Sequence, residues 1–180
     1  MPPFFIERSA MECEGFWDCL GVSLGSGVTH SLLLLLAVVV AVISVRSAKA
    51  TARRKQSADL LLHNRKDAEL VKALRCVAEL HDKGDGSIRG LANKGSATTD
   101  QSQLIRYALN HWEYVSVGVQ AGIYDEDMLL KASFNTVVTL HKNVSPFIDG
   151  LREIHGRDTL YQEFRWLATR WEEKGLAKKK

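Results

Sequence analysis

The feature that most constrains this chain is an uncharged apolar run near its N-terminus. The 26 residues from Leu20 to Val45 contain no Asp, Glu, Lys or Arg, and their only ionisable side chain is His30. A run of this length is typical of a helix that crosses the hydrocarbon core of a bilayer. It predicts a membrane-spanning helix over residues 20–45, after a short tail over residues 1–19. The Gly- and Ser-rich residues 21–27 either fray at the end of this helix or pack against another copy.

Two other interpretations of the run are a cleaved signal peptide and a buried core helix. The sequence AKA at Ala48 to Ala50 is similar to a signal-peptidase site. A signal peptide, however, begins with basic residues, whereas residues 1–19 carry four acidic residues and a single arginine. Arg46 and Lys49 also crowd the supposed cleavage point. These charges favour a retained anchor over either alternative.

The charges next to the span predict its orientation. Residues 46–55 carry five cations and no acid: Arg46, Lys49, Arg53, Arg54 and Lys55. Such flanks stay on the cytoplasmic side and lie against anionic lipid headgroups. We therefore expect a single-pass anchor with its N-terminus outside and residues 46–180 in the cytosol. No interleaved aromatic pattern accompanies the cations, so no nucleic-acid partner is expected.

Beyond the span the sequence predicts helices throughout. Apolar residues recur at spacings of three and four within residues 46–82, which predicts one basic stalk helix reaching Asp82. Residues 83–100 hold four glycines without a sustained period, which indicates a loop and a hinge. Residues 101–175 form the predicted helical head, and residues 176–180 a basic tail. The predicted fold class is all-α.

Four helical segments are expected in the head. The first begins at Asp100 or Ser102 and ends near Gly122, and Asp125 caps the second. This second segment is predicted over Met128–Leu140. The third begins near Pro146, and the last has Leu160 to Trp171 on one side. The head therefore has enough apolar residues at helical spacing to bury a small core.

Two stretches of the head resemble a known family. They are LNHWEYVSVGVQAGIYDEDMLL at residues 109–130 and LYQEFRWLATRW at residues 160–171. They are similar to a bacterial and bacteriophage family catalogued as a domain of unknown function, over residues 20–172 in outline. The resemblance implies an anchor, a stalk, an N-aromatic-aromatic-E helix, a GI-x-DE turn and an aromatic last helix. Those motif positions are Asn110, His111, Trp112, Glu113, Gly122, Ile123, Asp125 and Glu126, with His111 in place of the commoner aromatic residue.

Glu113 is the one candidate for acid–base chemistry. It lies on a helix predicted to be buried on two sides, and a buried carboxyl must be paired or protonated. The structural interpretation is that Glu113 accepts hydrogen bonds from Arg165, Trp166 or Arg170 of the last helix. The alternative is a hydrolase-like site around Glu113 with Asn110 and His111 nearby. We expect the structural role, and no catalytic residue.

The acidic run Asp125, Glu126 and Asp127 has a metal-binding and a structural interpretation. Acids at the start of a helix cap it and complement its dipole, which is the interpretation we favour. The six histidines are scattered, and no phosphate loop or paired-cysteine motif occurs. No metal and no cofactor is therefore expected. Cys13 and Cys19, on the tail side, are free to pair or to join two copies.

Two functions fit this sequence. The first is a membrane-tethered cytosolic module that binds a protein partner; the resemblance places it in the inner membrane of bacteria, in phage or mobile-element biology such as exclusion or defence. The second is a membrane-perturbing effector whose span self-assembles under control of the head. An exposed aromatic patch on the head would favour the first, and a polar face of the span the second. In both cases the span and stalk allow a homo-oligomer.

Overall fold

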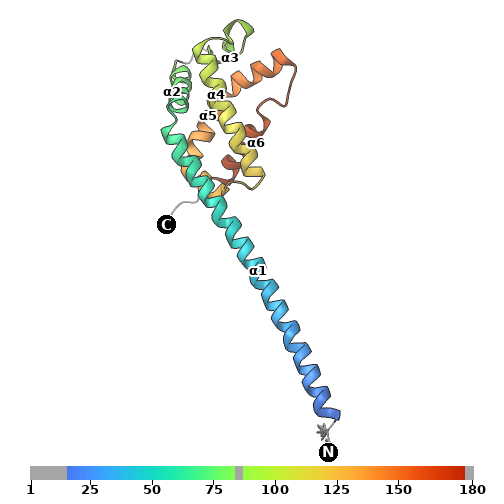
Figure 1. The fold of residues 1–180 in the computed structure, drawn as a ribbon. Coiled ribbons are helices and arrows are strands. Elements are labelled where there is room, and N and C mark those ends of the chain that lie inside the picture. Colours follow the sequence, from blue (N-terminus) through green and yellow to red (C-terminus); the bar gives the residue numbers. More distant parts are fainter. Residues whose placement is uncertain (1–15, 84–86, 177–180) are drawn as a thin grey trace, which may run out of the picture. The chain divides into compact units, whose positions relative to one another are not determined.

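The computed structural model describes the backbone of residues 16–83 and 87–176, and the side chains of residues 29–83 and 88–176. Within these residues every regular element is helical, which confirms the predicted all-α class (Figure 1). The elements are α1 (Phe16–Lys66), α2 (Ala68–Asp82), α3 (Ser87–Gly90), the short 3-10 helix η1 (Lys94–Ser96), α4 (Asp100–Gln120), α5 (Glu126–His155) and α6 (Gln162–Lys174). The chain divides into two units, residues 1–48 and 49–180.

The first unit carries the apolar run. The helix from Thr29 onward is long and apolar enough to cross a membrane, as predicted. Every large apolar side chain between Leu32 and Val45 is exposed, so the run is not a core helix of this chain. The tail with Cys13 lies outside the described residues, as do the side chains of Cys19 and of residues 21–27.

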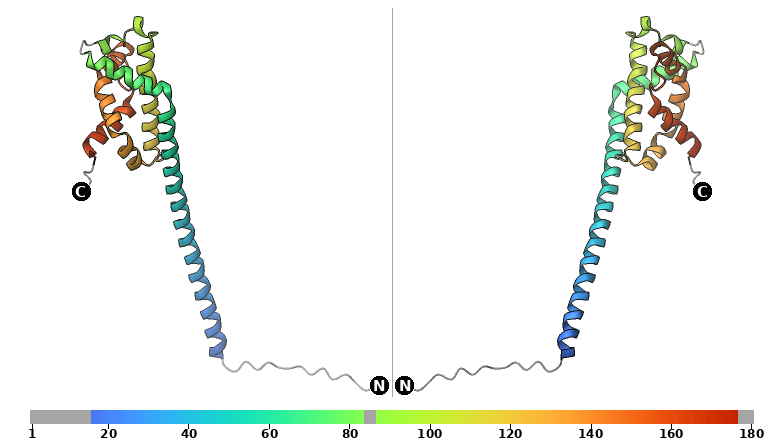
Figure 2. Two further views of the ribbon diagram at one scale, coloured as in Figure 1. Left: turned by 90° about the vertical axis from the view of Figure 1, so that its left-hand side faces the viewer. Right: turned by 90° about the vertical axis from the view of Figure 1, so that its right-hand side faces the viewer.

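Helix α1 ends at Lys66, so the prediction of one helix reaching Asp82 was wrong. Asp67 adopts an extended conformation, and its Oδ1 accepts a hydrogen bond from the Leu70 N–H at 2.9 Å. Its Oδ2 accepts a second bond from the Tyr107 hydroxyl at 2.9 Å. Because a capping carboxylate competes with the helical backbone for N–H groups, Asp67 ends one helix and begins the next. Figure 2 shows the chain changing direction there.

The second unit is built around α4 and α5. Helix α2 packs on α4 and α5, α3 packs on α5, and α6 packs on both α4 and α5 (Figure 1). The largest side chains that are fully buried between these helices are Trp171, Phe147, Phe164, Leu70, Ile105 and Leu109. The apolar stripe of α2 is therefore part of the core of the second unit, which begins at Lys49.

Part of the glycine-rich stretch packs against α5. Ile88 of α3 and Ala92 are both buried. Ala92 lies against Gly150 of α5, where an added Cβ would come within 2.9 Å of the Ala92 Cβ. A side chain at position 150 would push this segment off α5. The expected hinge falls partly on residues 84–86, which lie outside the described part of the chain.

Helix α5 is continuous through Pro146, so the expected separate helix starting there is absent. Pro146 is exposed, and the buried stripe of α5 continues past it from Val144 to Phe147 and Leu151. A proline removes one helical hydrogen bond. Burial of apolar residues on both sides of Pro146 outweighs that loss.

Candidate functional site

The residues Asn110 to Glu113 occupy about one turn of α4 and point to different sides of it. Asn110 is exposed, Trp112 is 2 % exposed, and His111 and Glu113 are half-buried. Successive helical residues are rotated by about 100°. The predicted motif is therefore not a single convergent site, and each of its residues contacts different neighbours.

Glu113 joins α4 to the start of α6. Its Oε2 accepts a hydrogen bond from the Phe164 N–H at 2.7 Å, and its Oε1 accepts one from the Glu163 N–H at 3.4 Å. The N-cap position of α6 is Tyr161, in a left-handed conformation, and its side chain makes no capping bond. The first N–H groups of a helix have no partner within the helix. Glu113 supplies that partner from a residue fifty positions away.

The structure thus corrects the expected partners of Glu113. We expected a side chain of the last helix, Arg165, Trp166 or Arg170, to donate to it. The last helix is indeed the partner, but the donors are its backbone N–H groups. The physical reason is that α6 lacks a cap of its own, and a carboxylate near a helix N-terminus also complements the helix dipole.

Burial sets the protonation behaviour of Glu113. Desolvation raises the pKa of this carboxyl, and the two backbone hydrogen bonds offset only part of that rise. A raised pKa is a property of catalytic acids. Here, however, both carboxylate oxygens are held by backbone N–H groups, which is the environment expected of a structural cap.

His111 and Trp112 form an edge-to-face pair with ring centroids 5.3 Å apart. Burial lowers the pKa of His111, so its neutral form is favoured. Its Nε2 and the Trp112 Nε1 are buried without a hydrogen-bond partner among the described residues. The pair therefore fills space between α4 and its neighbours.

The predicted GI-x-DE turn fixes the connection between α4 and α5. Gly122 lies two residues after the end of α4 at Gln120 and has a φ of +67°, which confirms the predicted helix stop. Asp125 caps α5 as predicted, because its Oδ1 accepts a hydrogen bond from the Met128 N–H at 3.1 Å. The turn thus carries a glycine where the backbone needs one and an acid where the helix needs a cap.

The same turn binds the last part of α1. Ser57 is fully buried, and its Oγ accepts a hydrogen bond from the Asp125 N–H at 2.7 Å while donating to the Arg53 carbonyl oxygen. The Arg54 guanidinium lies 3.7 Å from the Asp125 carboxylate. A Cβ on Gly122 would come within 2.9 Å of the Arg53 guanidinium. Two of the predicted membrane-surface cations therefore lie against the turn.

Glu126 and Asp127 form ion pairs with α6 in addition to lying in the first turn of α5. Arg170 donates to Glu126 at 2.8 Å, and Lys174 donates to Asp127 at 2.6 Å. Among the residues that the structure describes, no group of three His, Cys, Asp or Glu side chains is arranged to hold a metal ion. The acidic run thus contacts cations of the protein itself.

Sequence reasoning missed several residues that hold this arrangement. Ser57 gave no signal, because an isolated serine in a basic helix is ordinary. Asp67 did give one, since it interrupts the apolar spacing of the predicted stalk. Arg170 was considered only as a partner of Glu113, whereas it pairs with Glu126 and lies over the Trp166 ring.

One face of α4 is exposed and uncharged. It carries Tyr107, Asn110, Tyr114 and Val117, and Tyr114 is 78 % exposed. The only charged residues of α4 are Asp100, Arg106 and Glu113, none of which belongs to this set. We call these four residues the α4 outer face.

The comparison with protein families matches residues 31–171 to a domain of unknown function, DUF4760. The chain belongs to the DUF4760 family. The match covers most of the apolar run as well as the packed unit, so both belong to the family's domain. Neither the comparison with curated proteins nor that with solved structures gives a match.

Proposed function

We propose that this DUF4760 protein is a membrane-tethered interaction module whose helical unit binds a protein partner. The observation that carries the proposal is the α4 outer face, where Tyr107 and Tyr114 lie exposed beside Asn110 and Val117 and α4 itself contributes no charged side chain. At the edge of this face the Tyr107 hydroxyl donates to the Asp67 carboxylate. Protein interfaces are enriched in tyrosine and depleted of charge at their centres. A partner with an apolar, uncharged surface would cover this face.

The position of Asn110 supports a binding role for part of the motif. Asn110 is exposed three residues from Tyr107 and four from Tyr114, so it lies at the centre of the face. Its amide offers two donors and one acceptor to a partner. Glu113, by contrast, is used inside the protein, and we assign it no catalytic role.

The cellular setting of the proposal follows from the sequence. The cations after Val45 support a topology in which the helical unit is cytoplasmic and the N-terminus is outside, and the family resemblance suggests a bacterial inner membrane. The family resemblance suggests phage or mobile-element biology, such as exclusion or defence. A homo-oligomer formed through the span would present several copies of the α4 outer face to one partner.

Site-specific photocrosslinking in cells tests this proposal. A photoreactive amino acid at position 114 should give a discrete adduct, and a second substitution, Val117→Asp, should abolish it. The matched control carries the same amino acid at position 94, where Lys94 of η1 is exposed and is not part of the α4 outer face. Equal adducts at both positions, or none at position 114, would contradict the proposal. An adduct containing a second copy of the chain would replace the foreign partner with self-association.

A further inference from the structure

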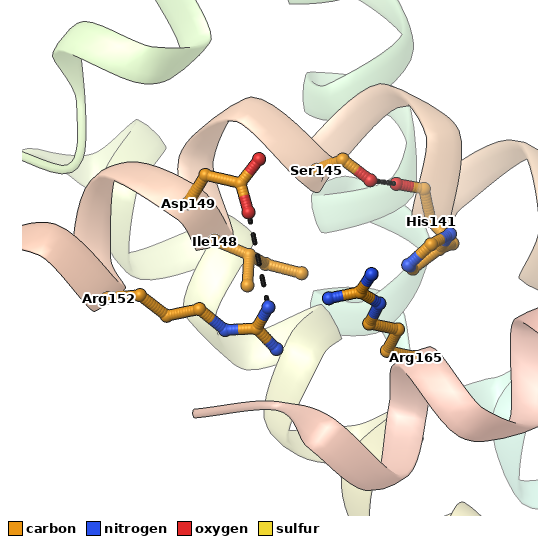
Figure 3. Close-up of a pocket in the computed structure, with 6 residues that line it drawn as sticks. All are labelled: His141, Ser145, Ile148, Asp149, Arg152 and Arg165. Carbon is orange, nitrogen blue, oxygen red and sulfur yellow. Dashed lines mark hydrogen bonds and ion pairs between the residues drawn. The ribbon is translucent and has the colours of Figure 1, made fainter. Parts of the chain in front are cut away.

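A cavity of about 220 Å³ lies between the second half of α5 and the start of α6 (Figure 3). It is lined by His141, Ser145, Ile148, Asp149, Arg152 and Arg165. None of the motif residues described above is among them. The lining is unusual for a small bundle because three of its six side chains carry, or can carry, a positive charge.

Arg152 is held rigidly at the wall of this cavity. Its side chain is only 12 % exposed, and its Nε and Nη2 donate to the Leu160 carbonyl oxygen at 3.0 and 2.7 Å. The remaining Nη1 is 4.0 Å from the Asp149 carboxylate, beyond hydrogen-bond distance. Figure 3 shows its guanidinium turned toward the space between the two helices. One arm of a fixed arginine is therefore available to a ligand.

Arg165 faces the cavity from α6. Its side chain makes no hydrogen bond or ion pair with any described residue, and in Figure 3 its guanidinium lies near the His141 ring. Burial lowers the pKa of His141, and the charges of Arg165 and Arg152 lower it further. The cavity is thus lined by two arginines and by a histidine whose protonation these arginines oppose.

The donors suit a tetrahedral anion better than a carboxylate. A carboxylate could pair with two parallel N–H groups of Arg165, but a planar group held in that way would leave the Arg152 Nη1 without an acceptor, because only the Nε and Nη2 of Arg152 are bonded to Leu160. The free donors instead approach from α5 and from α6. The Ser145 hydroxyl donates to the His141 carbonyl oxygen at 2.6 Å, so the arginines and the imidazole are the groups left to bind. A phosphate group offers several strong acceptor oxygens in different directions.

We propose that this cavity binds a phosphate group, either as inorganic phosphate or as the end of a small phosphate monoester. The site is distinct from the α4 outer face, so the proposal goes beyond the protein-binding function and does not depend on it. A bound dianion would neutralise the two arginines and favour the protonated form of His141. The Asp149 carboxylate at the rim opposes the anion and limits its affinity.

Proton uptake by His141 gives the site a recognisable pH dependence. The charged groups that act on His141 are Asp149 and Arg152 from α5 and Arg165 and Glu172 from α6, and Glu172 is paired with Lys142 at 2.7 Å. A phosphate monoester has its second pKa near 6, and inorganic phosphate changes charge near neutral pH, whereas sulfate stays dianionic. Sulfate affinity should therefore rise as the pH falls from 8 to 5.5, roughly in step with protonation of His141.

The experiment is a calorimetric titration of the full chain in a neutral detergent at constant ionic strength, with inorganic phosphate, adenosine monophosphate and chloride as probes. Phosphate should bind saturably, and Arg165→Gln should weaken binding by about tenfold, as loss of a charge-assisted bond implies. Arg157→Gln is the matched control, because Arg157 is exposed outside the cavity lining. Asp149→Asn should tighten binding.

Each outcome bears on the proposal. Tighter binding of the nucleotide than of inorganic phosphate would support a phosphate monoester, and the reverse would support free phosphate. No saturable heat beyond that of chloride, or an equal loss in Arg157→Gln, would overturn the site. Because Arg165 is exposed and makes no contact that the fold needs, its variant should melt at the parent temperature. Weaker phosphate binding in Asp149→Asn would contradict the proposal even if Arg165→Gln behaved as expected.

Discussion

The first N–H groups of α5 and those of α6 are capped in two different ways. The first N–H groups of α5 are satisfied by Asp125, the residue directly before the helix. Those of α6 are satisfied by Glu113, which lies on α4. A local cap stabilises one helix, whereas a remote cap also fixes the position of two helices relative to each other. Asp125 therefore stabilises one helix, whereas Glu113 also holds α4 and α6 together.

Removal of the remote cap should have the largest effect. Glu113→Leu leaves two N–H groups of α6 without an acceptor and should lower the free energy of unfolding by about 2–3 kcal/mol. Glu113→Gln should cost less than about 1 kcal/mol, because the amide keeps one acceptor oxygen and avoids desolvation of a charge. Thermal unfolding of the full chain in detergent measures both.

A control variant on α6 separates the loss of the cap from the mere loss of one negative charge. Glu173→Leu removes an exposed acid that makes no hydrogen bond or ion pair with the described residues, and should change stability by less than about 0.5 kcal/mol. A loss as large as that of Glu113→Leu would show that net charge, and not the cap, is being measured.

Removal of the local cap should come second. Asp125→Ala deletes one capping bond and the contact with Arg54, so a loss of about 1–2 kcal/mol is expected. Asp125→Asn should recover most of it, since asparagine is also a good N-cap. A loss larger than that of Glu113→Leu would reverse the order that distinguishes the local from the remote cap.

Loss of the contact between α1 and the turn should have the third-largest effect on stability. Ser57→Ala removes the acceptor of the Asp125 N–H and leaves that group near a buried methyl, at a cost of about 1 kcal/mol. Ser57→Thr keeps the hydroxyl but adds a methyl group where Ser57 is fully buried, so it tests packing separately. If the stability of both variants equalled that of the parent, the turn would not be what holds α1.

The pH dependence that Glu113 contributes is the subtlest effect. Its pKa is raised in the folded protein, so the folded state holds this proton more tightly than the unfolded chain. Stability from this group is complete below the ordinary glutamate pKa of about 4.3 and is lost as the pH rises through the folded value. Relative to Glu113→Gln, the parent should therefore become less stable as the pH rises from 4 toward neutrality. A difference that grew in the opposite direction would show that the hydrogen bonds outweigh burial.

The contrast between the caps also explains how much the sequence could predict. The apolar run, the helix stop at Gly122 and the cap at Asp125 depend on neighbouring residues and are visible in the sequence. The cap of α6 depends on a contact across fifty positions, so the sequence indicated the right helix but the wrong donors. Pro146 misled for a related reason, because local propensity predicts a break that burial of the flanking apolar residues prevents. The cavity shown in Figure 3 is lined by residues of two helices, and no pattern in the sequence predicted it.

Glu113 caps α6, and amide hydrogen exchange at Glu163 and Phe164 tests this role most directly. N–H groups in the first turn of a helix exchange rapidly unless something outside the helix protects them. In the full chain these two amides should be protected, and Glu113→Leu should abolish that protection while the Met128 amide, capped by Asp125, keeps its own. Unprotected amides at 163 and 164 in the parent, or protection that survives in Glu113→Leu, would contradict the account.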